Sequence, residues 1–164
     1  MKIIRTARSM AAWNERLRRE GVTIGFVPTM GALHGGHRSL IRAARLRCDA
    51  LVASIFVNPA QFSPTEDLST YPRTIARDRA LCREDGVDVF FEPTVRGMYP
   101  EGFQTTVTVP ALARLWEGAV RPHHFAGVAT VVTKLFGMVQ PHLALFGQKD
   151  YQQSALVRDR KSVV

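Results

Sequence analysis

The sequence predicts one α/β domain in which helices cover both faces of an open parallel sheet. Short apolar runs of strand length alternate with longer segments of helical periodicity. One run, ALVASIFV at Ala50–Val57, is apolar on both faces, which is typical of a central parallel strand covered on both sides. Glycine and polar residues follow two of the predicted strands where a helix begins, as in Rossmann-like folds. The 164 residues are enough for one domain with a substantial core.

The composition is that of an ordinary globular protein, with 46% hydrophobic and 22% charged residues. The net charge is +8, which raises the alternative of a basic, non-enzymatic nucleic-acid-binding domain. However, the basic residues are scattered through the predicted helices and do not form a block with interleaved aromatics. We therefore expect solvated helix faces that attract anionic substrates, and no nucleic-acid partner.

Cysteine content and hydropathy bear on the compartment. Cys48 and Cys82 are the only cysteines, each lies in a predicted helix, and no zinc-site spacing is present. Buried free thiols indicate a reducing compartment. The N-terminus has no signal-peptide core, and no apolar run is long enough to span a bilayer. We expect a cytoplasmic protein without a membrane partner.

The first part of the chain is predicted to form a strand, a helix, a second strand and a second helix. Thr6 can cap the first helix, and Gly21 can end it. We expect Pro28 to stop the second strand, because proline has no N–H for a ladder. The predicted ranges are Lys2–Ile4, Thr6 to about Glu20, Val22–Val27 and Ser39–Cys48.

Beyond the central strand, the pattern continues with alternating helices and strands. Thr74 is expected to cap a helix that Gly86 terminates, and Pro141 is expected to follow the end of another helix. The segment Thr105–Val109 alternates loosely and predicts an edge strand. The remaining predicted ranges are a helix from Thr74 to about Asp85, a strand at Val87–Phe91, a short helix at Ala111–Trp116, a helix from about Ala129 to Val139 and a strand at His142–Phe146.

The stretch Gly25–Leu40, GFVPTMGALHGGHRSL, combines a strand, a glycine-bearing turn and a helix start. The first N–H groups of a helix are unpaired and its dipole is positive there, so such a place suits a phosphate. His34 and His37 are three apart and can share one face and donate to one phosphate chain. The stretch is neither a Walker A loop nor a Gly-x-Gly-x-x-Gly turn. By spacing alone, a phosphate site and a structural turn are equally supported.

Two further polar segments follow predicted strands and should face the same cleft, since parallel strands share their carboxyl edge. Asn58–Phe62 follows the central strand and offers the amides of Asn58 and Gln61, although a simple Asn-Pro turn explains it as well. Gly147–Gln153 offers Lys149 as a point charge for phosphate, although a surface helix start is the alternative. For Arg121 and His124, a loop anchor and a ligand contact are equally supported.

The string Val27–His37, VPTMGALHGGH, closely resembles the signature of the pantothenate synthetase (pantoate–β-alanine ligase) family. Within it, HGGH resembles the His-x-Gly-His box of the wider nucleotidyltransferase superfamily. Further motifs resemble the same family in the same order, and the resemblance covers Met1 to about Arg158. These motifs are SIFVNPAQF at 54–62, EDL at 66–68 with YPRT at 71–74, an Arg121…HFAGV segment at 121–128, and FGQKDYQQ at 146–153.

The resemblance implies a two-step ligation. The carboxylate of pantoate attacks the α-phosphate of ATP to give pantoyl adenylate and pyrophosphate. The amine of β-alanine then attacks the acyl carbon, which releases AMP and pantothenate. The resemblance also implies Mg²⁺ held mainly by the substrate phosphates rather than by protein ligands, and a homodimer when the protein is full length.

The resemblance assigns roles residue by residue. His37 is the acid, and His34 and Lys149 stabilise phosphate charge. Gln61 and Gln153 hold pantoate, and Gln61 also lies near β-alanine. The residues implied to contact ATP are Met30, Gly31, Ala32, Leu33, His34, Gly35, Gly36, His37, Gly147, Gln148, Lys149 and Asp150. Weaker assignments are Pro28, Thr29, Asn58, Arg121 and His124, with Asp78 as a metal contact.

The sequence departs from the family at its end. Members of the family continue into a later Ser-Ser-Arg-Asn-like segment and a small second domain. We expect residues 1–158 to be a nucleotide- and pantoate-binding domain that is incomplete at its C-terminus, which leaves the activity of this chain open. One possible reverse translation of Asp159–Val164, GAT CGG AAG AGC GTC GTG, matches a common sequencing adapter, so we expect a non-native tail.

Two rival functions make different predictions. Another adenylyl- or cytidylyltransferase with the same histidine box would lack the motifs at Asn58–Phe62 and Gly147–Gln153. A basic RNA-binding domain would bind RNA in a salt-sensitive way and release no pyrophosphate.

Overall fold

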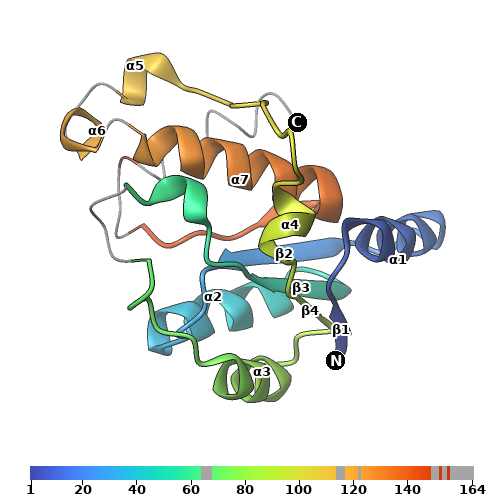
Figure 1. Ribbon diagram of the computed structural model, residues 1–164. Helices are drawn as coiled ribbons and strands as arrows, with labels where there is room; N and C mark the ends of the chain where they lie inside the picture. The colour runs from blue at the N-terminus through green and yellow to red at the C-terminus, as the bar shows by residue number, and fades with distance from the viewer. Residues whose placement is uncertain (64–67, 114–116, 122, 149–151, 153–154, 156–164) are drawn as a thin grey trace.

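The computed structural model describes residues 1–63, 68–113, 117–121, 123–148, 152 and 155 (Figure 1). Five strands form one parallel sheet in the order β1-β4-β3-β2-β5, which confirms the predicted Rossmann-like α/β class. The strands are β1 (Lys2–Ile4), β2 (Ile24–Thr29), β3 (Ala50–Ile55), β4 (Val89–Phe91) and β5 (Leu143–Ala144). The helices are α1 (Ala7–Arg19), α2 (Gly35–Arg45), the 3₁₀ turn η1 (Pro59–Gln61), α3 (Ile75–Glu84), α4 (Val95–Met98), α5 (Pro110–Ala113), α6 (Glu117–Val120) and α7 (His124–Val139).

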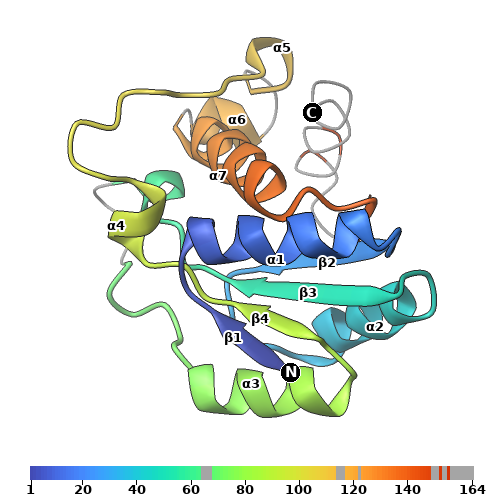
Figure 2. The same cartoon turned by 90° about the vertical axis from the view of Figure 1, so that its right-hand side faces the viewer.

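Helices cover both faces of the sheet, with α1 and α7 on one face and α2 and α3 on the other (Figure 2). All residues of β3 are buried. Val52 belongs to the apolar core under α1 and α7, whereas Leu51 and Ala53 belong to the core under α2 and α3. Successive side chains of a strand point to opposite faces, so a strand between two cores must be apolar throughout. The prediction for the central strand is confirmed.

The first helix follows the sequence prediction closely. The side chain of Thr6 accepts a hydrogen bond from the backbone N–H of Ser9, at 3.1 Å. Met10 and Leu17 are buried on its inner face, and Trp13 packs against the same core. Gly21 follows the helix with a φ of 71°, a left-handed conformation that glycine adopts without strain.

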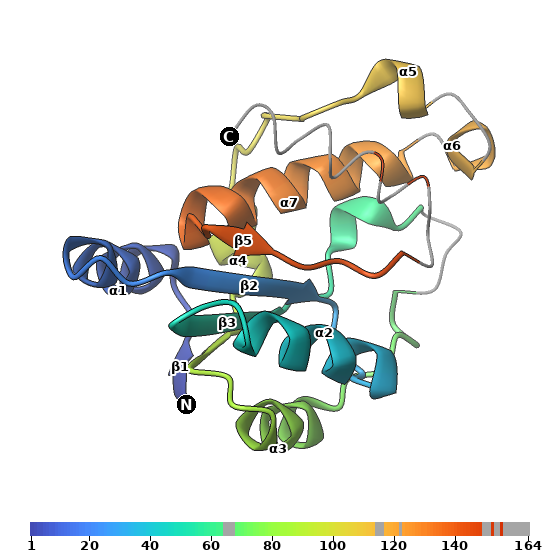
Figure 3. The ribbon, with the colours of Figure 1, turned by 180° about the vertical axis from the view of Figure 1, so that it is seen from behind.

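The expectation that Pro28 stops β2 is wrong, because the strand runs on to Thr29 and Pro28 pairs with Ser54 of β3. The C=O of Phe26 faces β5, where it accepts the N–H of Leu145, and the C=O of Thr29 faces β3. By this alternation, the nitrogen of Pro28 points toward the β5 side. Strand β5 pairs only with Gly25 and Phe26, so no ladder bond is lost at Pro28 (Figure 3).

Helix α2 starts earlier than predicted, at Gly35 rather than Ser39, and ends at Arg45. The imidazole of His34 caps the first turn, so the two glycines are accommodated there. Cys48 therefore lies outside the helix and is half-buried. Cys82 lies in α3 as predicted and is buried, which raises the pKa of its thiol to about 12.

The second half of the chain contains the other differences. Helix α7 begins at His124, because its buried apolar face extends through Phe125 and Val128. The edge strand expected at Thr105–Val109 is absent from the described residues. Instead, this segment lies over α7, where the N–H of Val107 donates to Thr130 Oγ1 at 3.0 Å. Thr74 precedes α3 but makes no side-chain cap, and the last strand spans only Leu143–Ala144.

The order of the strands reverses at β2. The chain moves in one direction from β2 through β3 to β4, and then crosses back to the far side of β2 to form β5. Ligands of open α/β sheets bind where the strand order reverses, outside the carboxyl ends of the strands. The turn that follows β2 and residues 145–148 after β5 therefore lie on the side of this point (Figure 3). No helix in the described part of the chain is both long and apolar enough to cross a bilayer.

Candidate functional site

The turn that follows β2 is held by a buried carboxylate. Gly31 and Ala32 have φ values of 94° and 50°, so two consecutive residues are left-handed. Asp78 on α3 accepts the backbone N–H of Ala32 at 3.1 Å and that of Leu33 at 2.9 Å. Its side chain is fully buried, and Thr74 Oγ1 donates to it as well. The carboxylate supplies the acceptors that this turn cannot find within itself.

The two histidines of the motif form a capping arrangement at the start of α2. His34 Nδ1 accepts the backbone N–H of Gly36 at 3.1 Å, and His37 Nδ1 accepts the backbone N–H of His34 at 3.4 Å. The ring centroids are 4.1 Å apart. A neutral imidazole whose Nδ1 accepts a hydrogen bond carries its proton on Nε2. This arrangement leaves both Nε2–H groups available as donors beside the helix N-terminus.

The electrostatic environment at the start of α2 favours a neutral histidine that donates a hydrogen bond to a bound anion. Burial lowers the pKa of His37 below its ordinary value of 6.5, and the nearby His34 lowers it further, while Asp78 acts in the opposite direction. The lowered pKa favours the neutral form of His37. The open N–H groups and the dipole of α2 add partial positive charge next to it. Together these features suit a phosphate chain.

Two arginines of α2 bind a buried carboxylate that follows α3. Asp85 accepts Arg38 Nε at 2.6 Å and Nη2 at 2.8 Å, and it accepts Arg42 Nε at 2.8 Å. The hydrogen bond from Arg38, followed by that from Arg42, lowers the pKa of Asp85 against the effect of its burial. The clamp fixes α2 against the end of α3, and Arg38 directly follows His37. Planar guanidinium groups suit such a two-point contact.

The segment after β3 brings amide groups against the same turn. Gln61 Nε2 lies 3.0 Å from Met30 Sδ, and Met30 directly precedes Gly31. The backbone C=O of Gln61 lies 3.0 Å from His124 Nδ1, at the start of α7. Asn58 is buried and donates to Gln61 Oε1 at 3.2 Å. The structure thus brings together Met30, Asn58, Gln61 and His124.

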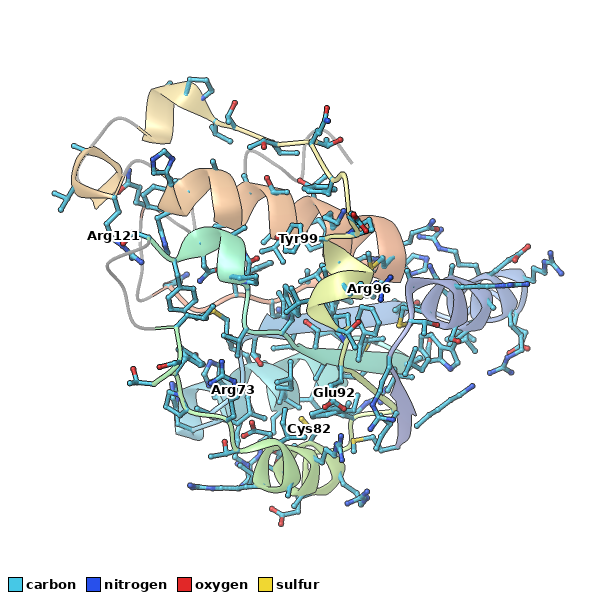
Figure 4. The ribbon with its side chains drawn as sticks, in the orientation of Figure 1. Arg73, Cys82, Glu92, Arg96, Tyr99 and Arg121 are labelled. Carbon is cyan, nitrogen blue, oxygen red and sulfur yellow. The ribbon has the colours of Figure 1, made fainter. Side chains whose placement is uncertain are left out.

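The other predicted site residues lie partly within and partly outside the described residues. Gly147 and Gln148 are exposed just after β5. Arg121 is partly buried beside the N-terminal end of α7 (Figure 4). Pro28 and Thr29 end β2, where Thr29 Oγ1 accepts the N–H of Gly31. The predicted contacts at Lys149, Asp150 and Gln153, and the tail at 159–164, lie outside the described residues.

Asp78 has a structural role in addition to the metal contact that the resemblance implies, which stays a prediction. Both of its oxygens accept hydrogen bonds from the turn after β2 and from Thr74. Among the described residues, no group of three His, Cys, Asp or Glu side chains could hold a metal ion. In the structure, Asp78 anchors the turn that precedes His34.

Sequence reasoning missed two residues that organise the site. Tyr99 Oη donates to Asn58 Oδ1 at 2.7 Å, although no motif marks Tyr99. The sequence indicates Asp85 only as the approximate end of a helix, because its clamp on Arg38 depends on a contact 47 residues away. Arginines at a helical spacing of four in α2 are the only available signal for such a partner.

Comparison with known proteins decides the family. The family model described as "Pantoate-beta-alanine ligase" matches residues 2–161. The chain belongs to this family. A pantothenate synthetase of Agrobacterium fabrum is 57% identical over 158 residues, covering 96% of this chain and 54% of the relative. One of Trichlorobacter lovleyi is 56% identical, over 96% of this chain and 56% of the relative. The chain therefore spans just over half the length of these relatives.

Solved structures of family members agree with the fold. Pantothenate synthetase from Thermus thermophilus superposes with a TM-score of 0.93 at 52% identity, covering 99% of this chain and 58% of that chain. A pantoate-beta-alanine ligase from Francisella tularensis, complexed with beta-gamma ATP and beta-alanine, gives a TM-score of 0.93 at 38% identity. It covers 99% of this chain and 62% of that chain.

Proposed function

We propose that this chain carries the nucleotide- and pantoate-binding part of a pantoate–β-alanine ligase. The reaction is the ATP-dependent condensation of pantoate with β-alanine through a pantoyl adenylate, which gives pantothenate, AMP and pyrophosphate. One observation carries the proposal: the Nδ1 atoms of His34 and His37 both accept backbone N–H groups at the start of α2, which makes Nε2 the donor atom of each ring. Family membership supports the choice of substrates.

The phosphates of ATP would lie at the N-terminus of α2. The turn 30–33, the two histidines and the exposed Gly147 and Gln148 border this place, and Lys149 and Asp150 follow in sequence. A neutral His37 can donate to a phosphate oxygen and stabilise the negative charge that grows on leaving pyrophosphate. The complex of the Francisella relative with beta-gamma ATP supports ATP as the nucleotide.

Pantoate and β-alanine would lie between this phosphate site and Gln61. The amide of Gln61 can hold a hydroxyl or a carboxylate close to the α-phosphate, which turns the attack into a positioned, intramolecular-like step. Asn58, His124 and Arg121 border the same place, and Gln153 is the second pantoate contact. The complex of the Francisella relative with beta-alanine supports β-alanine as the second substrate.

We further propose Mg²⁺ as a companion of ATP, and a cytoplasmic homodimer that binds neither nucleic acid nor membrane. Magnesium is commonly held by substrate phosphates and few protein ligands, which suits an ion that enters with ATP. When bound, it would neutralise phosphate charge.

The proposal is tested by pyrophosphate release that depends on pantoate, together with direct ATP binding by calorimetry. We expect weak ATP binding and slow or no release from the 164-residue chain, and full ATP binding and pantoate-dependent release from a chain extended to the length of its relatives. In the extended chain, His37→Ala should lose rate on the order of a hundredfold. His123→Ala is the matched control, since His123 is exposed outside the histidine pair. An active His37→Ala variant would refute the role of His37. Absence of both ATP binding and pantoate-dependent release from the extended chain would refute the function.

A further inference from the structure

The amide of Gln61 ends a chain of hydrogen bonds that begins outside the cleft. Tyr99 follows the last residue of α4 and lies beside α7 (Figure 4). Its hydroxyl donates to Asn58 Oδ1 at 2.7 Å. Asn58 Nδ2 then donates to Gln61 Oε1 at 3.2 Å and to the C=O of Gly127 at 3.1 Å. Three segments that are distant in sequence are thus linked through one buried amide.

The partners of Asn58 fix the direction of every bond in this chain. The C=O of Gly127 can only accept, so it must face the NH₂ group of Asn58. The N–H of Ala60 can only donate, and it lies 3.3 Å from Asn58 Oδ1. Gln61 therefore faces Asn58 with its oxygen, which leaves its own NH₂ directed toward Met30 and the cleft. An amide set this way offers N–H donors to a ligand oxygen.

Tyr99 supplies the shorter of the two hydrogen bonds to Asn58 Oδ1, and contacts of its ring hold the hydroxyl in place. Its ring packs edge-on against Phe103 at 5.2 Å between centroids, and the ammonium of Lys134 lies 5.6 Å from the ring centroid. Burial raises the pKa of Tyr99 to about 12, so the hydroxyl keeps its proton and remains a donor. Without this donor, the buried Oδ1 of Asn58 retains only the longer bond from Ala60.

We propose that Tyr99 is a positioning residue that fixes the amide of Gln61 through Asn58, so that Gln61 presents N–H donors to an oxygen of pantoate. This inference rests on the proposed function. Tyr99 itself does not touch the substrate in this account. Its effect should therefore appear in the affinity for pantoate and should leave the phosphate site unchanged.

The first test, in the chain extended to the length of its relatives, is Tyr99→Phe, which removes the hydroxyl and retains the ring packing. We expect the KM for pantoate to rise about tenfold, since a neutral hydrogen bond contributes about that much. The KM for ATP should stay within about twofold. Phe103→Leu is the control, because it disturbs the same ring contacts and breaks no bond in the chain. An unchanged pantoate KM in Tyr99→Phe, or an equal rise in Phe103→Leu, would overturn the proposal.

A double-mutant cycle tests the route through Gln61. In a Gln61→Ala background, Tyr99→Phe should raise the pantoate KM no further, whereas independent effects would multiply. The side-chain NH₂ resonances of Asn58 and Gln61 give a reading that needs no turnover. They should shift in Tyr99→Phe and stay in place in Phe103→Leu. Absence of pantoate-dependent activity from the unsubstituted extended chain would refute the proposed function alone, while unshifted resonances would refute the positioning role.

Discussion

Asp78 Oδ1 lies 2.9 Å from the backbone nitrogen of Leu33, so a side chain on α3 holds the turn that leads into α2. The other oxygen accepts the N–H of Ala32, at the left-handed part of the turn. An ionised carboxylate only accepts hydrogen bonds, and the two backbone N–H groups only donate them, so the two match. The position of the histidine pair therefore depends on an acid on another helix.

We expect Asp78→Asn to destabilise the fold by about 1–3 kcal/mol, because an amide replaces one of two buried acceptors with a donor facing an N–H. ATP affinity should fall at the same time, since the turn before His34 loosens. Urea unfolding and calorimetry measure the two effects. The control for the loss of one negative charge is Glu101→Gln, on the exposed loop after α4. Asp88 is exposed as well, but it binds Arg45 and is therefore a poor control. Wild-type stability and ATP affinity in Asp78→Asn would contradict the anchoring role.

We expect Asp85→Asn to lower the unfolding midpoint and to weaken ATP binding. The substitution removes the charge that Arg38 and Arg42 share, and it leaves these guanidinium groups without their central partner. Glu84→Gln is the matched control, because Glu84 is exposed and touches Arg38 only at the rim. The idea of a clamp fails if both variants unfold at the same urea concentration.

Stability should fall as the pH drops below about 6.5, because of His37. Its pKa is lowered in the folded state, so the unfolded chain binds the proton more readily. The contribution is complete above the unfolded pKa of 6.5 and is lost as pH falls toward the folded value. Asp85 has a lowered pKa too, and its contribution disappears only in a more acidic range, below its ordinary 3.8.

The measurement is urea unfolding at pH 7.5 and at pH 5.5, for the wild type and His37→Gln. The fall in unfolding free energy between these two values should be smaller in His37→Gln. An identical fall in both proteins would show that His37 does not contribute to this pH dependence.

Two glycines of α7 should respond in opposite directions to alanine. A Cβ at Gly127 would lie 2.2 Å from the C=O oxygen of Ala60, so the helix and η1 would have to separate. We expect Gly127→Ala to cost about 1–3 kcal/mol and to displace Gln61. Gly137 meets no atom within 4 Å, so Gly137→Ala should add about 0.5–1 kcal/mol through helix propensity. Thermal unfolding of the two variants measures both changes in stability. Equal changes in the two variants would mean that the contact between Gly127 and η1 is not tight.

The parts of the fold that depend on local pattern could be predicted from the sequence. The apolar run of β3, the Thr6 cap and the strand–turn–helix at the histidine motif each carry their signal within a few residues. Thr105–Val109 shows the limit of this reasoning. Its alternation resembles a strand, but its partner is the Thr130 hydroxyl on α7 rather than another strand.

For the candidate site, too, the sequence predicts the residues that lie in local motifs. The motif residues His34, His37 and Gln61 lie where the sequence places them, at the ends of β2 and β3. The supporting residues were not predictable, since Tyr99 reaches Asn58 across 41 residues and Asp78 reaches Leu33 across 45. Nothing in the local sequence of a tyrosine or an aspartate indicates such a distant acceptor or donor.

The order of strands in the sheet has a consequence for how the chain acquires its structure. Strands β2, β3 and β4 are neighbours both in sequence and in space, so their pairing closes short loops at modest entropic cost. The outer strands β1 and β5 pair with residues that are far away in the sequence, so their pairing closes long loops at a larger entropic cost. Lys2 pairs with Val89, and Ile24 meets His142 across 118 residues. We therefore expect the central unit to form early and both ends of the chain to join it late, which makes the sheet edges the last parts of the molecule to become protected from hydrogen exchange.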